Sequence, residues 1–188
     1  MKSILTALAI ATGSLLGLTS IGALAADGTL TFTGQVTDTT CSINGNAPGT
    51  AADLAISLAP VAAGSLATLG AVAGTTNAGD ITFNLTGCSG AATKAIVGFE
   101  NGATVDQATG YLTNQAAIGG ATNVEVRLLN ASMQPINITN DSNNNTQQNA
   151  ATITGGAATL TYFAQYYATG AATPGPFNTS IQYSMFYE

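Results

Sequence analysis

The chain has 188 residues, of which nine are acidic, three are basic and none is histidine. At a formal net charge of −6 it has no basic patch to neutralise phosphates, which argues against nucleic acid as a partner. Without histidine, any catalysis would depend on scattered carboxylates, so the composition argues against an enzyme, and no cofactor or metal is expected. The hydrophobic fraction of 46% is sufficient for the core of about one domain.

Residues 1–25 are typical of a secretory signal peptide. Lys2 provides the positive start, residues 4–18 form a mostly apolar stretch, and residues 23–25 form a small-x-small cleavage site. A membrane anchor is disfavoured because no unbroken apolar span of about 18 residues is present. We therefore expect an exported chain that begins at Ala26, with two basic and nine acidic residues and a net charge of −7.

The two cysteines, Cys41 and Cys88, are an even pair in a chain predicted to be exported. In an oxidising compartment such a pair most simply forms one intrachain disulfide. On the chain-entropy model, a loop of this length stabilises a fold by roughly 4 kcal/mol. The competing interpretation, a metal site, lacks both C-x-x-C spacing and histidine.

Short runs in which apolar and polar residues alternate predict β-strands throughout the mature chain. The apolar residues of these runs are Leu30, Phe32 and Val36; Ile56 and Leu58; Ile81, Phe83 and Leu85; Val124, Val126 and Leu128; Ile136 and Ile138; Ile153; Leu160, Tyr162 and Ala164; and Ile181, Tyr183, Met185 and Tyr187. The glycines within residues 60–73 predict an irregular connection there.

Turn-rich connectors separate these runs at residues 45–49, 74–79, 119–121, 140–149 and 170–175. The asparagine-rich connector, residues 140–149, is interpreted as a solvated hairpin loop. Seven or so short strands at this spacing predict an all-β fold, a single β-sandwich of the immunoglobulin type.

The mature chain also carries a specific order of residues at its two ends. Residues 26–36 read ADGTLTFTGQV and run into Cys41, while residues 162–175 read YFAQYYATGAATPG and are followed by a penultimate Tyr187. The intervening residues keep an order given by the motifs Ile56-x-Leu58-x-x-Val61, Phe83-x-Leu85-x-x-Cys88 and Ala121-Thr-Asn-Val124. In this joint order the chain resembles pilins of the chaperone-usher pathway, in particular type 1 major fimbrial subunits.

The resemblance implies an immunoglobulin-like β-sandwich that lacks its last strand and therefore has an apolar groove. In that family a periplasmic chaperone first lends a strand, and the N-terminal extension of the next subunit then replaces it. The implied partners are neighbouring subunits in a homopolymer, the periplasmic chaperone and the outer-membrane usher. The implied location is the periplasm and then a cell-surface fimbria that supports adhesion.

The resemblance also divides the chain into a donor-strand extension, residues 26–37, and a pilin domain, residues 38–188. Alternate residues of the extension would share the face that enters a neighbour's groove, and the small residue at position 34 would occupy a shallow part of it. These residues are Gly28, Leu30, Phe32, Gly34 and Val36. The alternation alone fits an ordinary first strand equally well, so that alternative stays open at this point.

The C-terminal strand is implied to border the groove and to pair with the chaperone, which would anchor the terminal carboxylate. The residues assigned to it are Gly175, Ile181, Tyr183, Met185, Tyr187 and Glu188. They could also be core residues, and the two roles are compatible. The alternative function is a minor, adaptor or receptor-binding fimbrial subunit; about 160 mature residues are too few for a two-domain tip adhesin.

Overall fold

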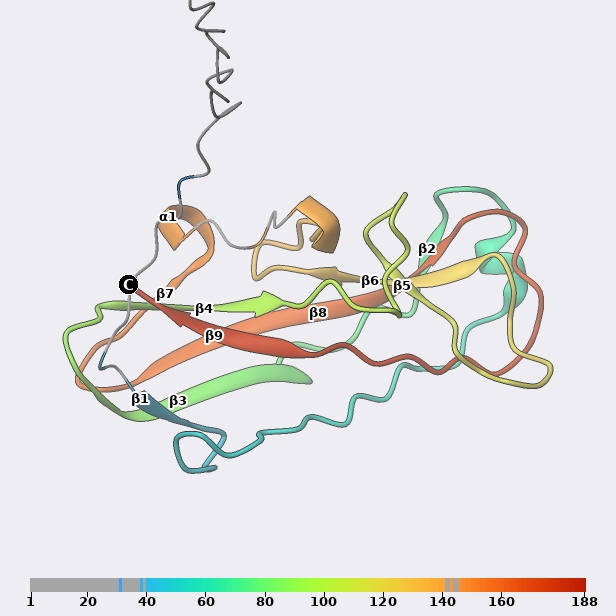
Figure 1. The fold of residues 1–188 in the computed structure, drawn as a ribbon. Helices are drawn as coiled ribbons and strands as arrows, with labels where there is room; N and C mark the ends of the chain where they lie inside the picture. The colour runs from blue at the N-terminus through green and yellow to red at the C-terminus, as the bar shows by residue number, and fades with distance from the viewer. Residues whose placement is uncertain (1–30, 32–37, 39, 141–142, 144–145) are drawn as a thin grey trace, which may run out of the picture. The chain divides into compact units, whose positions relative to one another are not determined.

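The computed structural model describes residues 31, 38, 40–140, 143 and 146–188 (Figure 1). The predicted signal peptide and the five predicted donor-strand residues, Gly28, Leu30, Phe32, Gly34 and Val36, lie outside the described residues. Within the described part of the chain, no helix is long and apolar enough to cross a membrane.

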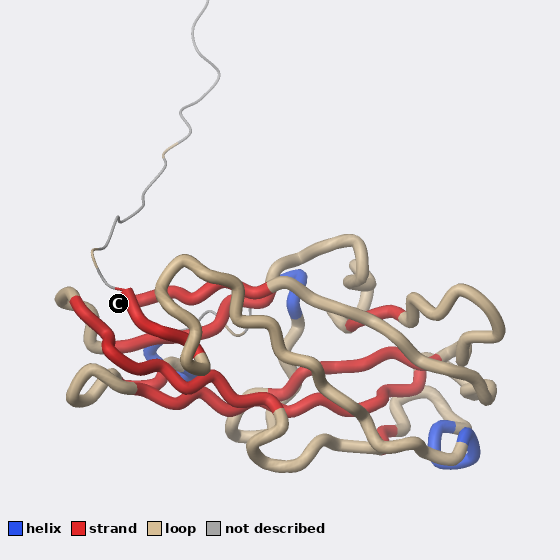
Figure 2. Tube along the Cα trace, turned by 90° about the horizontal axis from the view of Figure 1, so that it is seen from below, coloured by secondary structure: helices blue, strands red, loops and turns tan. Residues whose placement is uncertain are grey.

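The described residues form two antiparallel sheets (Figures 1 and 2). The larger sheet has the strand order β1 (Thr40–Ile43), β3 (Ile81–Ser89), β8 (Ala158–Ala168), β6 (Val124–Leu129) and β5 (Leu112–Thr113), with β2 (Val72–Ala73) also paired to β8. The smaller sheet has the order β7 (Ala151–Thr152), β4 (Lys94–Phe99) and β9 (Tyr183–Tyr187). The remaining elements are the 3-10 turns η1 (Ala63–Leu66) and η2 (Ile138–Asn140) and the helix α1 (Thr146–Asn149).

The core lies between the two sheets, because alternate residues of the strands on each side face inward. Tyr162 on β8 contacts Phe83 on β3 and Phe99 on β4 edge to face, with ring centroids 6.0 and 5.2 Å apart. Val97 on β4 is completely buried beside them. These contacts across the sandwich confirm the predicted all-β, immunoglobulin-like fold.

Strand β4 is the element that the alternation pattern missed. Its sequence KAIVGF has no apolar-polar alternation, because both faces of the strand are buried. Ala95, Val97 and Phe99 face the core, while Ile96 on the other face is also fully buried and helix α1 lies against the strand. A strand covered on both sides has no polar face to reveal its period.

Two predicted strands are wrong. Residues 56 and 58 belong to a long loop between β1 and η1, visible as a stretch without strands in Figure 2, because no neighbouring strand pairs with them. Ile136 and Ile138 are buried as expected, but the chain turns at Pro135 and enters η2 instead of extending. The predicted irregular connection at residues 60–73 is correct apart from η1 and the short β2.

The asparagine-rich connector is not a solvated hairpin loop. It passes from the larger sheet to the smaller one and contains α1, and its Asn143 is 2% exposed. The Asn143 amide donates hydrogen bonds to the Val97 carbonyl at 2.5 Å and to the Tyr162 hydroxyl at 3.3 Å. Asn143 is buried because its amide pairs with a backbone carbonyl of β4 that no neighbouring strand reaches.

The predicted disulfide is present between Cys41 on β1 and Cys88 on β3. The two strands pair from Thr40 opposite Ser89 to Ile43 opposite Leu85, with an irregularity in register between residues 40 and 42. The disulfide therefore fastens the first described strand to a central part of the larger sheet.

Candidate functional site

A groove of about 740 Å³ runs between the loop that follows β1 and the C-terminal strand β9. One wall is formed by residues 48–56 and the other by residues 180–187. Its floor is the edge of the core, and the floor residues are Ile81, Phe83, Phe99 and Leu128. The groove is therefore apolar at its base and lies where one more strand would continue the smaller sheet beyond β9.

The β9 wall presents unpaired backbone groups to the groove. Lys94 and Glu188 exchange two hydrogen bonds at 2.9 and 3.0 Å, and the Glu100 amide donates to the Gln182 carbonyl at 2.9 Å. Because such pairs alternate along an antiparallel ladder, every second residue of β9 directs its N–H and C=O away from β4. Those residues are Tyr183, Met185 and Tyr187.

The opposite wall and its continuation along the smaller pocket, together residues 51–61, are also unpaired. In the part of the chain that the structure describes, the backbone of residues 51–61 belongs to no strand and makes a single hydrogen bond, between the Ala52 carbonyl and the Tyr183 hydroxyl at 2.6 Å. Exposed rows of N–H and C=O groups are templates for pairing with another chain. The groove thus has two such rows facing each other across an apolar floor.

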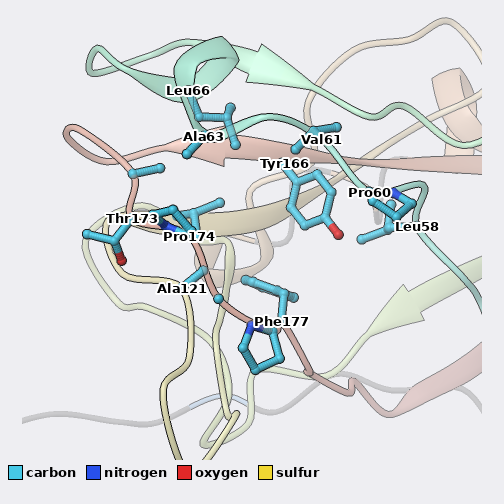
Figure 3. A pocket seen from close by; sticks show the side chains of 14 residues that line it. Leu58, Pro60, Val61, Ala63, Leu66, Ala121, Tyr166, Thr173, Pro174 and Phe177 are labelled. Atoms are coloured by element: carbon cyan, nitrogen blue, oxygen red, sulfur yellow. The ribbon is translucent and has the colours of Figure 1, made fainter.

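A smaller pocket of about 310 Å³ continues along the same two segments (Figure 3). Residues 58–66 line one side and residues 172–177 line the other, with Tyr166 and Phe177 in edge-to-face contact at 5.6 Å between ring centroids. A small cluster of buried side chains around Leu66 lies beneath it. The apolar depression therefore extends from β9 to the loops that precede it in the chain.

The C-terminal residues named from the sequence fall into two groups. Ile181, Tyr183, Met185 and Tyr187 pack against the core and line the groove, so their core and groove-edge positions coexist. Gly175 lies in the loop before β9, where it lines the smaller pocket instead. A Cβ at Gly175 would collide with the carbonyl oxygen of Gly119, so glycine here permits the close approach of two loops.

The main-chain oxygen of Glu188 is bonded within the domain. It accepts hydrogen bonds from the amides of Thr93, at 2.6 Å, and Lys94, at 2.9 Å. These bonds hold the last residue of the chain at the end of β4. The proposed pairing of this residue with a chaperone is not part of what the described residues show.

Tyr183 connects the two walls of the groove. Its ring stacks edge to face on Phe83 at 4.7 Å between centroids, and its hydroxyl reaches Ala52. Burial raises the pKa of the Tyr183 hydroxyl, and the carboxylate of Asp53 raises it further, so the hydroxyl stays protonated as a donor at neutral pH. The position of Tyr183 at the groove agrees with the family resemblance, whereas its bond to Ala52 has no signal in the sequence.

Replacing Tyr183 with phenylalanine is expected to loosen the wall formed by residues 51–61. The variant keeps the ring and loses one hydrogen bond, which costs about 1 kcal/mol and lowers Tm by about 2–4 °C. Hydrogen exchange followed by mass spectrometry should show faster exchange in residues 51–61. The matched control is Tyr111→Phe, since Tyr111 stacks on Tyr167 away from the groove; unchanged exchange in Tyr183→Phe would contradict the role of this bond.

The described residues contain no group of three metal-ligating side chains. Among them, Glu125 is the one buried acidic side chain. Burial raises the pKa of its carboxyl group, the hydrogen bond from Thr109 at 2.9 Å opposes this, and the nearby Asp106 adds to it. Asp106 and Glu125 are a pair of carboxylates that the sequence did not reveal, but they lie outside the groove.

Comparisons with known proteins agree with this geometry. The family described as "FimA: Type-1 fimbrial protein, A" matches residues 58–188. The chain is 44% identical to the major fimbrial subunit SMF-1 of Stenotrophomonas maltophilia, over 92% of this chain and 99% of that protein. It is 38% identical to the F17 fimbrial protein of Escherichia coli, over 94% of this chain and 96% of that protein.

Solved structures support the same fold. A type I fimbria protein of Burkholderia pseudomallei superimposes with a TM-score of 0.53 at 27% identity, covering 81% of this chain and 97% of that one. A subunit of a chaperone-usher pilus superimposes with a TM-score of 0.56 at 20% identity, covering 97% of this chain and 100% of that one. From its sequence matches and its sandwich, the chain belongs to the type-1 fimbrial protein family and is a structural subunit of a fimbria.

Proposed function

We propose that this subunit polymerises by strand donation, with residues 28–36 of one copy inserted in the groove of the next. The observation that carries the proposal is the pair of unbonded backbone rows on β9 and on residues 51–61, which face each other across an apolar floor. A strand placed between them would satisfy both rows and bury its alternate side chains. A heterologous contact of this kind does not close, so it produces a filament.

The donated segment has a suitable length and pattern. Nine residues in a strand span about 27 Å at about 3.3 Å per residue. Burial of the side chains of Leu30, Phe32 and Val36 contributes on the order of 1.5–3 kcal/mol each before ordering costs. The fibre subunit is exported to the periplasm, where chaperone and usher handle it before it joins the surface fimbria.

The proposal treats the subunit as structural and without catalytic activity. In support, the chain contains no histidine, and the buried Glu125 does not line the groove. The relatives that match over nearly their whole length include major fimbrial subunits, which favours a shaft role over a minor or receptor-binding role.

The alternation of apolar and polar residues in 28–36 provides a sharp test of strand donation. We expect the double substitution Leu30→Asp and Phe32→Asp to abolish the polymer, since it would place charges on the apolar floor. The double substitution Thr31→Asp and Thr33→Asp on the opposite face of the same strand should leave it intact. The measurement is an unboiled gel of surface extract, in which a strand-linked polymer runs as a ladder that collapses to monomer on heating.

Equal loss of the ladder in both variants would contradict insertion of one face of the strand. Persistence of the ladder in the Leu30 and Phe32 variant would contradict strand donation altogether. In each case the amount of soluble periplasmic subunit is measured in parallel, so that a folding defect is separated from an assembly defect.

A further inference from the structure

Three of the six large apolar side chains that are exposed in the described residues lie in or next to the loops at one end of the groove. They are Leu69 at 72% exposure, Ile118 at 90% and Val72 at 43%. We refer to residues 67–72, 117–121 and 169–176 as the loop end.

Hydrogen bonds hold the loop end together. The Gly70 amide donates to the Ala168 carbonyl at 2.8 Å, and the Ala172 amide donates to the Leu66 carbonyl at 3.0 Å. On the other side, the Ala121 amide donates to the Pro176 carbonyl at 3.0 Å. The segment that carries Leu69 and the segment that carries Ile118 are therefore each bonded to the chain around residues 168–176, and these loops lie at the right-hand end of Figure 1.

The next step rests on the proposed function and gives the direction of the donated strand. Strands of an immunoglobulin-like sandwich pair antiparallel, so a strand added to the free edge of β9 runs opposite to it. Residues 169–176 precede β9, which means that β9 runs away from the loop end. The inserted strand consequently runs toward the loop end and finishes there with Val36.

The folded domain of the donating copy must then lie next to the loop end of the accepting copy. Only three residues separate Val36 from Thr40, where β1 begins. Even fully extended, this link spans about 13 Å. This short link therefore keeps the donating domain adjacent to the loops of the accepting domain.

We propose that the loop end is a second contact surface between successive subunits, and that its occupant is the β1 end of the donating copy. No residue of the loop end is charged, although the mature chain carries a net charge of −7. An uncharged, apolar end allows two acidic copies to approach with little repulsion. Leu69 and Ile118 are buried in the fibre, while the groove supplies the strand contact.

The test uses the full chain in surface fibres. The double variant Leu69→Ser with Ile118→Ser removes the two most exposed large apolar side chains without changing the core. The control, Met133→Ser, removes another exposed apolar side chain away from the loop end. The fibres are held at a fixed temperature below the one at which the ladder collapses. Fibres of the double variant should dissociate to monomer at least about tenfold faster than parental fibres, because buried apolar side chains are lost from the contact. Met133→Ser should dissociate at the parental rate.

A disulfide cross-link between two copies tests the same contact independently. Asp38 follows Val36 by two residues, so the proposal predicts that Asp38→Cys on the donating copy comes close to Ile118→Cys on the accepting copy. This double variant should give a ladder that survives boiling until reductant is added, whereas Asp38→Cys with Met133→Cys should not.

Parental dissociation of the double serine variant, or trapping through position 133 instead of 118, would overturn the loop-end contact while leaving strand donation in place. Failure of strand donation itself is recognised separately, by a ladder that persists in the Leu30 and Phe32 variant.

Discussion

A subunit that lacks residues 26–36 is expected to accept a strand and to donate none. When expressed with its chaperone but without the full-length subunit, it should give soluble, folded, chaperone-bound subunit and no ladder on an unboiled gel. The described residues that line its groove all lie within 40–187, so we expect deletion of the extension to leave both walls and the floor unchanged. Loss of the Leu30, Phe32 and Val36 side chains removes on the order of 1.5–3 kcal/mol of burial each, together with all of the donated backbone bonds.

Mixing this deletion variant with the full-length subunit sharpens the prediction. A subunit that accepts but cannot donate can occupy only one end of a fibre, so fibres should shorten as its share of the subunits rises. Fibre length is measured by electron microscopy, and the full-length Thr31→Ser variant serves as a control that retains the extension. Fibres of parental length at a high share of the deletion variant would contradict a donated strand.

Replacing Cys41 and Cys88 with alanine is expected to have the largest effect on subunit stability. The disulfide joins residues 47 apart, and on the chain-entropy model it stabilises the fold by roughly 4 kcal/mol. That is a large part of the 5–15 kcal/mol typical of a domain. Denaturant unfolding of the oxidised and variant subunits measures the difference directly.

The same substitution should also reduce assembly, because the bond fixes a part of the groove. Thr40, Cys41 and Ile43 line the groove at its β1 side, and β1 pairs only with β3 in the larger sheet. We expect lower periplasmic yield of soluble subunit and a weaker ladder. The single variant Cys41→Ala, which leaves a free thiol at Cys88, separates the loss of the bond from reactivity of the remaining cysteine; unchanged stability in both variants would contradict the stabilising role.

The strands predicted correctly are those with one buried face. In β3, β8 and β9 the alternation of apolar and polar residues follows the alternation of core and outer surface, so sequence period and structure agree. Strand β6 is largely buried on both faces, but its sequence still alternates because Glu125 and Arg127 are polar. Strand β4 was not predicted because Ile96 is buried on the face opposite to Val97. Burial on both faces depends on packing against α1, which no local pattern encodes.

The candidate site, like the strands, was predicted only in part from the sequence. The apolar residues of β9 were placed at the groove from the sequence, since their alternation and the family resemblance agree. The second wall was not found, because the alternation of Ile56 and Leu58 predicts a strand, whereas residues 51–61 pair with no strand in the described part of the chain. The bond between Tyr183 and Ala52 joins residues 131 positions apart, and such contacts follow from the tertiary fold alone.

The position of the disulfide determines how a pulled fibre would pass tension from one subunit to the next. The extension that we propose as the donor strand, residues 26–37, ends three residues before Cys41, and Cys41 is linked to Cys88 in β3. Tension on the extension therefore enters the larger sheet at β3, through the disulfide and the pairing of β1 with β3. Residues 51–61 lie inside the covalent loop from 41 to 88, so this tension is not carried along the backbone between the two cysteines.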